Sequence, residues 1–572
     1  MEPTGASRGA ILMGQAFVDH PSRRLLCALL LACVLPAGCS VPQPDRPAST
    51  YELDFSMPAG STVRGVVVFV VDGLDSGVFN ELLDAGELPT FKKYFIDRGL
   101  YAPRAVANIP SVTLANLVSL ATGKFCGHHG IVGVNWFDRN RLVWRNYDTI
   151  AQKNHVDEDY VCPNIYEMLP TETTVSLFFQ PHRRASKFIE QWTSAGPPFF
   201  FRWYEFVDRL TLLRFNVILD IARQQRRWPG VTYVYQLAPD FRAYHHGADS
   251  VEYRSAIRHS DTQIGRVLAD MERAGLLDKL HLALVTDHAH GQTTRHFIIN
   301  DLLRKVGLQP SPEQLWKEPF EERLEAYSKV NVVTYGSGER YWAISLRKPI
   351  RQDGRVVGFE PWVERPSPED LAAYPTIGRG PCEQPRVTGQ VDLLKTLADQ
   401  PAVDAIAYSP GDGRVRVRRA VGEVEFRQAA PREPISYRLI SGEDPLGWAG
   451  RIPAEALAGA PLSPWQWLEA TADTDFPDLP AQITAYFRSR YAGDVAAFAA
   501  PGWDFTTLYK SGHGGLRPED MLVPFAIAGP GVPHGVLKTA RTVDLVPTIL
   551  QLLGEPVPAD LDGRSLLPVT ND

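Results

Sequence analysis

The most apolar stretch of the chain is residues 65–73, whose centre is valine and phenylalanine without alternating polar positions. Such a run predicts a strand that is buried on both faces, as in parallel sheets covered by helices. Other apolar runs predict further strands, at residues 173–179, 232–237, 280–287 and 523–528. Helical spacing of apolar positions predicts helices at residues 77–94, 200–227, 255–274 and 540–553. These elements predict an α/β fold around a mostly parallel sheet.

The character of the chain changes after about residue 305. Residues 310–500 are dense in proline, glycine and charged residues, and their predicted strands, such as 340–346 and 413–419, are short. This composition indicates an insertion or cap on the α/β core. The expected organisation is a core in two parts, residues 63–304 and 505–572, with a cap at residues 305–504.

The N-terminus carries the pattern of a secretory signal peptide. Two arginines precede an apolar run at residues 25–35, which is too short for a permanent membrane-spanning helix. Residues 35–39, Leu-Pro-Ala-Gly-Cys, resemble the lipobox of bacterial lipoproteins, although Pro36 takes the usual place of leucine. We therefore expect a signal peptide with a lipobox at residues 1–39 and a linker rich in proline and serine at residues 40–62. A secreted protein without a lipid is the alternative.

Charge and cysteine content narrow the classes of function. The 572 residues include 59 basic and 66 acidic side chains, and the net charge of −7 argues against wrapping of a nucleic acid. Small phosphorylated substrates remain compatible with this charge, because metal ions can supply the positive charge. The six cysteines form no closely spaced metal-binding pairs, which excludes zinc fingers and ferredoxin-like clusters. Among Cys126, Cys162 and Cys382, one disulfide could form in an oxidising compartment.

Aspartates stand at or just beyond the carboxyl ends of separate predicted strands. They are Asp72, Asp240 and Asp287. Histidines follow two of these aspartates closely, His245 or His246 after Asp240 and His288 after Asp287. A further histidine, His513, stands in a glycine-flanked turn. Ligands of open α/β sheets bind at this edge, and aspartate with histidine but no thiolate is typical of a hydrolytic zinc or manganese site. For Asp72, an N-cap of the following helix is the alternative.

A hydroxyl group stands at a predicted helix start. Pro110 is followed by Ser111, Thr113 and an apolar periodic run, which indicates a helix N-terminus. Free backbone N–H groups and the positive end of the helix dipole suit a phosphoryl group there. The alternative is that Ser111 or Thr113 is simply the N-cap.

Together these residues resemble the alkaline phosphatase superfamily, in particular its type I phosphodiesterase/nucleotide pyrophosphatase branch. The resemblance covers roughly residues 65–300 and 505–570. The motifs that carry it are Val71-Asp72-Gly73, residues 110–116, Thr122-Gly123, residues 129–132, Asp240 with a histidine and Gly247, Thr286-Asp287-His288 and Gly512-His513-Gly514. It implies an alkaline-phosphatase-like three-layer sandwich around a mostly parallel sheet, with a cap or insertion domain. It also implies two divalent metal ions, usually zinc in that family, although such ligands accept manganese as well.

The resemblance implies a role for each matching residue. One metal would be held by Asp72, Thr113, Asp287 and His288, and the other by Asp240, His245 and His513. Thr113 would be the nucleophile, which a metal activates, and would form a phospho-threonine intermediate that water hydrolyses. Asn135, one position later than the family's asparagine, is the expected substrate contact, and Asn116 is expected to support the nucleophile helix.

The ligands of the second metal depart from the family pattern. The family's histidine lies four residues after the equivalent of Asp240, and this chain has Tyr244 there. His245 or His246 must then serve through a shift of one or two residues. His290, which follows His288 after one alanine, could compete as a ligand.

The predicted function is a metal-dependent phosphodiesterase or nucleotide-pyrophosphatase-like hydrolase of small phosphorylated substrates. We expect it to be exported and anchored by an N-terminal lipid, in the periplasm or at the cell surface. A phosphomonoesterase or phosphoryl-headgroup transferase of the same superfamily is the nearest alternative, and a non-catalytic surface lipoprotein that retains the fold is another. A sulfatase is disfavoured, because Ser111 and Thr113 lack the Cys/Ser-x-Pro-x-Arg setting.

Overall fold

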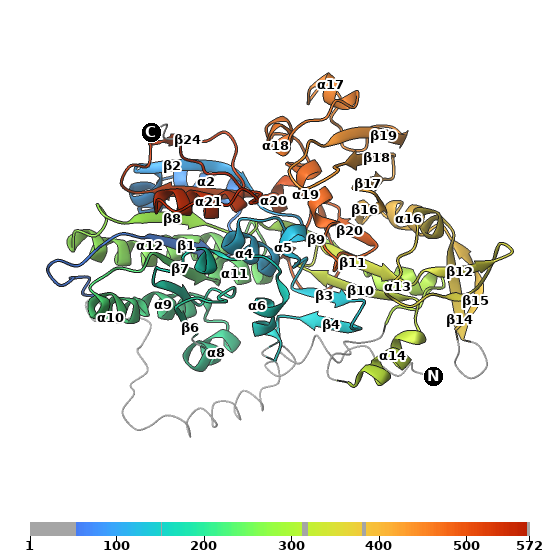
Figure 1. The fold of residues 1–572 in the computed structure, drawn as a ribbon, viewed down its shortest axis with the longest axis horizontal. Helices are drawn as coiled ribbons and strands as arrows, with labels where there is room; N and C mark the ends of the chain where they lie inside the picture. The colour runs from blue at the N-terminus through green and yellow to red at the C-terminus, as the bar shows by residue number, and fades with distance from the viewer. Residues whose placement is uncertain (1–52, 150, 191, 312–317, 380–384, 569–572) are drawn as a thin grey trace.

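The computed structural model describes residues 53–149, 151–190, 192–311, 318–379 and 385–568 (Figure 1). The predicted signal peptide, most of the predicted linker and Cys382 lie outside these residues. Cys126 and Cys162 are both buried and free, so the disulfide considered from the sequence does not join this pair. Among the described helices, none combines the length and apolar character that crossing a bilayer requires.

An eight-stranded sheet forms the centre of the α/β part (Figure 1). Its strands, in spatial order, are β24 (Gly535–Val536), β2 (Gly99–Val106), β23 (Leu522–Ala528), β8 (His281–Val285), β1 (Val66–Val71), β7 (Val231–Gln236), β5 (Thr174–Leu177) and β6 (Lys187–Ile189). The strands from β8 to β6 run parallel, whereas β23 runs antiparallel to both of its neighbours. The mostly parallel sheet expected from the sequence is confirmed.

Both faces of this sheet are covered, which explains the unbroken apolar run of β1. Val66, Val68 and Val70 pack into one core, which includes side chains of α4 (Thr113–Thr122) and α21 (Leu545–Leu552). The intervening Val67, Phe69 and Val71 pack into a second core with α2 (Ser76–Asp84), α10 (Phe215–Gln225) and α12 (Val251–Arg273). The result is a three-layer sandwich.

Two of the helices expected from the sequence are each divided. The helical pattern at 77–94 becomes α2 and, after Gly86 at a φ of 73°, the short α3 (Pro89–Phe91) with the π-helical turn η3 (Lys92–Ile96). The pattern at 200–227 becomes α9 (Tyr204–Leu213) and α10, which are separated at Arg214. Residues 127–138 contain the end of α5 (Cys126–His129) and β3 (Asn135–Asp138), which pairs with β4 (Val143–Asn146).

The proline- and glycine-rich part of the chain contains a second, seven-stranded antiparallel sheet (Figure 1). Its strands, in spatial order, are β10 (Val332–Ser337), β11 (Tyr341–Leu346), β20 (Val495–Ala499), β16 (Val403–Gly411), β17 (Arg414–Arg419), β18 (Gly422–Arg427) and β19 (Ser436–Gly442). The other main elements of this part are α14 (Phe320–Ser328), β12 (Pro349–Gln352), β13 (Arg355–Phe359), β14 (Tyr374–Arg379), β15 (Pro385–Val391), α16 (Leu393–Ala398), α18 (Pro464–Thr471) and α19 (Leu479–Tyr486).

A small three-stranded sheet lies where the two parts of the chain meet. Its central strand, β9 (Gly291–His296), pairs with β21 (Gly502–Asp504) and β22 (Ser511–Gly512). The turn between β10 and β11 also contacts this region, because Gly338 O accepts a hydrogen bond from His513 N and Arg340 N donates to His513 O. The insertion therefore reaches the carboxyl edge of the central sheet.

Candidate metal centre and active site

Adjacent parallel strands bring the predicted aspartates together. The strands β8, β1 and β7 are neighbours in the central sheet, so their carboxyl ends meet at one edge. Asp72 directly follows β1, Asp287 lies two positions after β8, and Asp240 lies in the first turn of α11 (Ala238–His246), after β7. All three side chains are buried.

The segment after β1 is shaped for close approach of these groups. Asp72 is not an N-cap, because Asp75 caps α2 by accepting from Val78 N. Gly73 has a φ of 70°, and a Cβ atom there would lie 2.9 Å from both Asp240 Cα and His290 Nε2. Glycine at this position therefore lets Asp72 and Asp240 share one small space.

A first group of candidate ligands surrounds the Nε2 atom of His288. This atom lies 3.4 Å from Asp72 Oδ1, 3.4 Å from Asp287 Oδ2 and 2.9 Å from Thr113 Oγ1. Its Nδ1 atom faces Ala289 O at 3.1 Å and must donate, because a carbonyl oxygen only accepts. The Nε2 lone pair is then directed toward the carboxylates and the threonine, which is the form of histidine that binds a metal.

Thr113 stands at the first position of α4. Val112 is the N-cap and has no side-chain cap, so neither Ser111 nor Thr113 plays that role. Ser111 Oγ instead accepts from Gly514 N and donates to Gly515 O, next to His513. The uncapped first turn leaves backbone N–H groups beside the Thr113 hydroxyl, as phosphoryl binding requires.

Asn116 supports the approach to this helix, as expected from the sequence. Its Oδ1 atom accepts from Asn108 N at 2.7 Å, and its Nδ2 atom donates to Pro110 O at 2.9 Å. The side chain thus ties the loop before α4 to the helix itself.

A second group of candidate ligands surrounds Asp240. His290 Nε2 lies 2.8 Å from Asp240 Oδ1, and the Nε2 atoms of His288 and His513 both lie 3.9 Å from it. His513 follows β22 and donates from Nδ1 to Ser111 O at 2.8 Å, which directs its Nε2 atom into the same space. The His288 and His513 rings stack at a centroid distance of 3.5 Å.

His245, predicted as a ligand of the second metal, does not join this group in the structure. Its Nε2 atom is hydrogen bonded with the Tyr204 hydroxyl at 3.0 Å, while His246 lies 3.6 Å from Glu252. The reason is helical phase, since residues four apart share a face and a fifth residue is turned away by a further 100°. Tyr244 occupies the facing position, and His290, from the loop before β9, takes the place beside Asp240.

Burial sets the charge state of these groups. Burial, followed by the charges of Asp240 and Asp287, holds the pKa of Asp72 well above its usual range. Burial raises the pKa of Asp240 to about 7, against an opposing effect of His288. Burial also lowers the pKa of His290 to about 3, and it lowers the pKa values of His288 and His513. The site therefore favours neutral imidazoles beside crowded carboxylates, a combination that added cations would stabilise.

The residues present fit divalent metal ions. Asp72 Oδ1 and Asp287 Oδ2 are buried without a hydrogen-bond partner, although unpartnered carboxylate oxygens are costly. Within the described residues, the ligand atoms of Asp72, Asp287 and His288 lie within 4.8 Å of one another, as do those of Asp240, His288 and His290. Oxygen and imidazole donors without thiolate suit zinc and manganese.

Asn135, predicted to contact the substrate, has a partner in the insertion. Its Nδ2 atom donates to Gly336 O at 2.9 Å, and its backbone N donates to Ser337 Oγ. Its Oδ1 atom is buried without a partner. Asn135 thus joins β3 to the end of β10. The turn that contacts His513 begins at the next residue after β10.

A family model described as type I phosphodiesterase/nucleotide pyrophosphatase matches residues 66–356, half of the chain. The chain belongs to this family. This family lies within the alkaline phosphatase superfamily, as the sequence motifs indicated.

A solved structure extends the type I phosphodiesterase comparison to the fold. Human ectonucleotide pyrophosphatase/phosphodiesterase 5 is similar with a TM-score of 0.52 at 13% identity, over 86% of this chain and 96% of that chain. This likeness shows the α/β sandwich fold.

Two curated relatives match short segments of the chain. The putative extracellular sulfatase Sulf-1 homolog of Caenorhabditis elegans is 38% identical over 80 residues, which is 11% of each protein. The extracellular sulfatase SULF-1 homolog of Drosophila melanogaster is 46% identical over 52 residues, 9% of this chain and 5% of that protein. The chain thus spans about a tenth or less of the length of these relatives.

Proposed function

We propose that this chain hydrolyses phosphodiesters or nucleotide pyrophosphate bonds through a phospho-threonine intermediate at Thr113. The observation that supports this proposal is the position of the Thr113 hydroxyl. It stands at the uncapped start of α4, 2.9 Å from His288 Nε2 and near Asp72 Oδ1 and Asp287 Oδ2, two buried carboxylate oxygens that lack hydrogen-bond partners.

Two divalent ions are part of the proposal. One would be held by Asp72, Thr113, Asp287 and His288, and the other by Asp240, His290 and His513. Zinc and manganese both suit these donors. When bound, such ions lower the pKa of a hydroxyl or a water and offset negative charge on phosphoryl oxygens.

In the proposed reaction, Thr113 Oγ1 gives its proton to solvent and attacks phosphorus opposite the leaving oxygen. The new O–P bond forms as the ester O–P bond breaks, and the alcohol or nucleotide fragment leaves, its oxygen taking up a proton from solvent where it needs one. The first-turn N–H groups of α4 donate to the non-bridging oxygens, where negative charge accumulates. Water then attacks the same phosphorus and frees the Thr113 hydroxyl.

We assign Asn135 a positioning role, because its amide holds the hairpin next to His513.

Replacement of the nucleophile tests this mechanism. We expect Thr113→Ala to lower kcat for bis(p-nitrophenyl) phosphate by on the order of 10³-fold or more, because no hydroxyl remains to form the intermediate. Thr113→Ser keeps a hydroxyl and should retain much of the rate. The melting temperature of both variants serves as the control for the fold. A Thr113→Ala enzyme with the wild-type rate would overturn the assignment. Rates on p-nitrophenyl phosphate, measured in parallel, separate a diesterase from a monoesterase.

We also propose that residues 305–504 act as a cap that shapes substrate choice, and that the chain is exported with a lipid on Cys39. The lipobox-like residues 35–39 support export, and the relatives named above are described as extracellular. Fatty-acid labelling that persists in Cys39→Ser would contradict the lipid attachment.

A further inference from the structure

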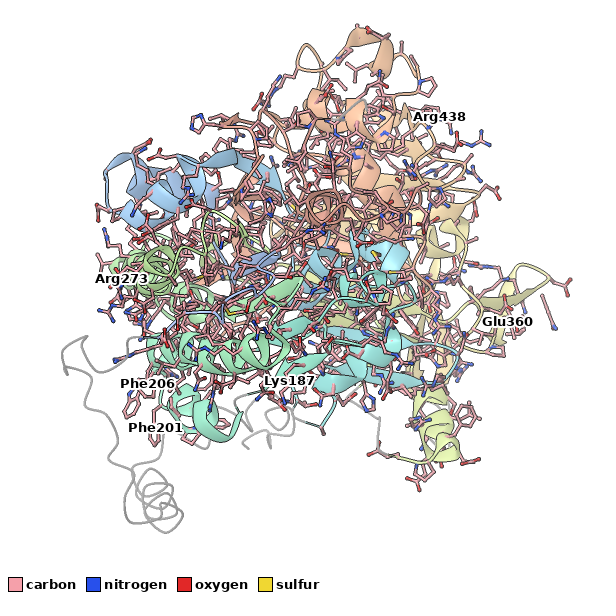
Figure 2. All side chains as sticks on the ribbon, turned by 60° about the vertical axis from the view of Figure 1, so that its left-hand side comes forward. Lys187, Phe201, Phe206, Arg273, Glu360 and Arg438 are labelled. Atoms are coloured by element: carbon pink, nitrogen blue, oxygen red, sulfur yellow. The ribbon has the colours of Figure 1, made fainter. Side chains whose placement is uncertain are left out.

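The turn between α8 (Trp192–Phe200) and α9 exposes aromatic side chains. Phe200 is 48% exposed, Phe201 is 37% exposed and Trp203 is 55% exposed. Figure 2 shows Phe201 and Phe206 together at one edge of the molecule. Large apolar side chains that gather on a surface mark a contact with a partner or a membrane. We call Phe200, Phe201 and Trp203 the aromatic turn.

The aromatic turn is anchored from behind. Phe199 packs edge-on against Phe241 of α11 at a centroid distance of 5.0 Å, and it lies 5.7 Å from Tyr204. Arg202 adopts a φ of 62°, a left-handed conformation that reverses the chain direction here. Phe201 and Trp203 contact each other, with ring centroids 5.6 Å apart. The backbone is thus fixed by Phe199 while the neighbouring rings face solvent.

The charge around the aromatic turn is positive. Arg202 is exposed between the rings, and the exposed Lys187 lies on the same lower part of the molecule in Figure 2. Both acidic side chains of α9 already have partners within the protein. Glu205 binds Arg242 at 2.7 Å, and Asp208 is buried and accepts from Leu237 N and Ala238 N. An anionic surface would therefore meet a basic, aromatic patch without an opposing free carboxylate from this helix.

The beginning of the folded domain lies on the same side. The helix α9 packs against both α8 and α10 (Figure 1). Arg223 of α10 binds Asp54 at 2.9 Å. Residues 40–52 separate Leu53 from Cys39, the proposed lipid attachment. The chain from Cys39 to Leu53 can span about 50 Å at most when it is fully extended. A lipid on Cys39 would therefore keep this side of the domain within reach of the bilayer.

We propose that the aromatic turn docks on the surface of a lipid bilayer, with its rings at the level of the headgroups and Arg202 on lipid phosphates. The proposal goes beyond hydrolysis and does not depend on it. Docking would take place beside the helix that carries Asp240, because Tyr204 bonds His245 and Phe199 packs on Phe241, both on that helix.

Quenching by brominated lipids tests the proposal on the full chain. The protein is bound to vesicles of phosphatidylcholine and phosphatidylglycerol whose acyl chains carry bromine, and tryptophan emission is measured. We expect clear quenching of the wild type and much weaker quenching of Trp203→Phe, because Trp203 is the residue that enters the interface. Equal quenching of the two proteins would overturn the proposal.

Binding strength gives a second readout. Phe200→Ser/Phe201→Ser/Trp203→Ser should lower the vesicle partition coefficient by about tenfold or more. Val357→Ser/Val363→Ser is the matched control, because these valines are 55% and 52% exposed and belong to the insertion. An unchanged partition coefficient in the triple variant would overturn the proposal. A second result would also overturn it. If the wild type is a dimer in solution and the triple variant is a monomer that still binds vesicles, the aromatic turn is an interface between two copies of the chain. Diester hydrolysis and melting temperature confirm that each variant is folded.

Discussion

At the scale of single residues, Tyr244 decides the shape of the second candidate ligand group. Its hydroxyl donates to His513 Nε2 at 2.6 Å, and its ring meets that of His290 edge-on, with centroids 5.1 Å apart. Imidazole is a much commoner zinc ligand than a phenol. A nitrogen donor beside Asp240 therefore has to come from another segment, and His290 provides it from the loop that also carries His288.

Removal of His290 should weaken metal binding. We expect His290→Ala to lose roughly one of two ions per chain after dialysis. His513, which lies further from Asp240, would then be the only histidine left among the proposed ligands of that ion. His245→Ala is the matched control and should keep the wild-type metal content, because His245 bonds Tyr204 instead. Plasma mass spectrometry of both variants checks this. Loss of an ion from His245→Ala alone would show that α11 rotates on metal binding and would contradict the arrangement described above.

The sequence was informative for ligands that directly follow strands. Asp72, Asp287 and His288 could be placed together because they end neighbouring buried strands, whose apolar runs are unmistakable. The histidine beside Asp240 could not be placed in this way. Its position depends on the phase of α11 and on the path of the loop after Asp287, and neither leaves a periodic signal in the sequence.

At the scale of elements, α9 holds the start of α11. Asp208 is fully buried and accepts hydrogen bonds from Leu237 N at 2.8 Å and from Ala238 N at 3.0 Å. These bonds fix the corner between β7 and α11, and Asp240 follows in the first turn. Burial raises the pKa of Asp208 to about 7, although the two backbone N–H groups oppose this shift.

This shift predicts a pH dependence of stability. A carboxyl group whose pKa is raised in the folded state stabilises the fold fully only below its unfolded pKa of about 4, and this contribution is lost as pH rises through about 7. We expect Asp208 to lower the free energy of unfolding by about 2 to 3 kcal/mol between about pH 5 and pH 8.

Urea denaturation across this pH range, compared with Asp208→Asn, measures the contribution. The asparagine cannot ionise, so its curve should be flatter by that amount even if the variant is less stable at every pH. Parallel curves for the two proteins would show that Asp208 keeps its charge in the folded state.

Elements could be predicted where burial alone determines them. Five strands of the central sheet, β1, β5, β7, β8 and β23, agree with the apolar runs to within a residue or two at most ends, whereas β2, β6 and β24 were not predicted. The break at Arg214 between α9 and α10 was missed, because the amphipathic pattern continues across it and neither glycine nor proline marks it. The order of strands in the antiparallel sheet of the insertion depends on long-range pairing, which short alternating runs do not specify.

At the scale of the whole molecule, a buried ion pair joins the insertion to the C-terminal part of the core. Arg541 is fully buried and binds both carboxylate oxygens of Asp478 at 2.6 Å, and its guanidinium also donates to Pro464 O. Asn108, in the loop that leads to α4, bonds Thr542 next to it. The pair thus connects the insertion, the C-terminal segment and the nucleophile helix.

Breaking this pair should destabilise the protein. We expect Arg541→Met to lower the free energy of unfolding by about 3 to 5 kcal/mol, because it leaves the Asp478 charge buried without its countercharge, with Gln482 Nε2 as the remaining side-chain donor. Arg541→Met/Asp478→Asn removes that charge and should recover part of the loss, since asparagine tolerates the φ of 55° at this position. The exposed Arg564, which stacks on Trp465, provides the control, and Arg564→Met should cost about 1 kcal/mol or less. Denaturant titration of the three variants would contradict this account if all were equally stable.

The small sheet formed by β9, β21 and β22 has a consequence for biosynthesis. The strand that follows His290, β9, pairs with β21 at the very end of the insertion and with β22 just after it. During translation, the aspartates and the first histidines emerge early, but His513 and the strand that seats it come close to the last. The centre is thus completed at the end of synthesis, and a chain that terminates before β22 would lack His513 together with β23 and α21 of the sandwich.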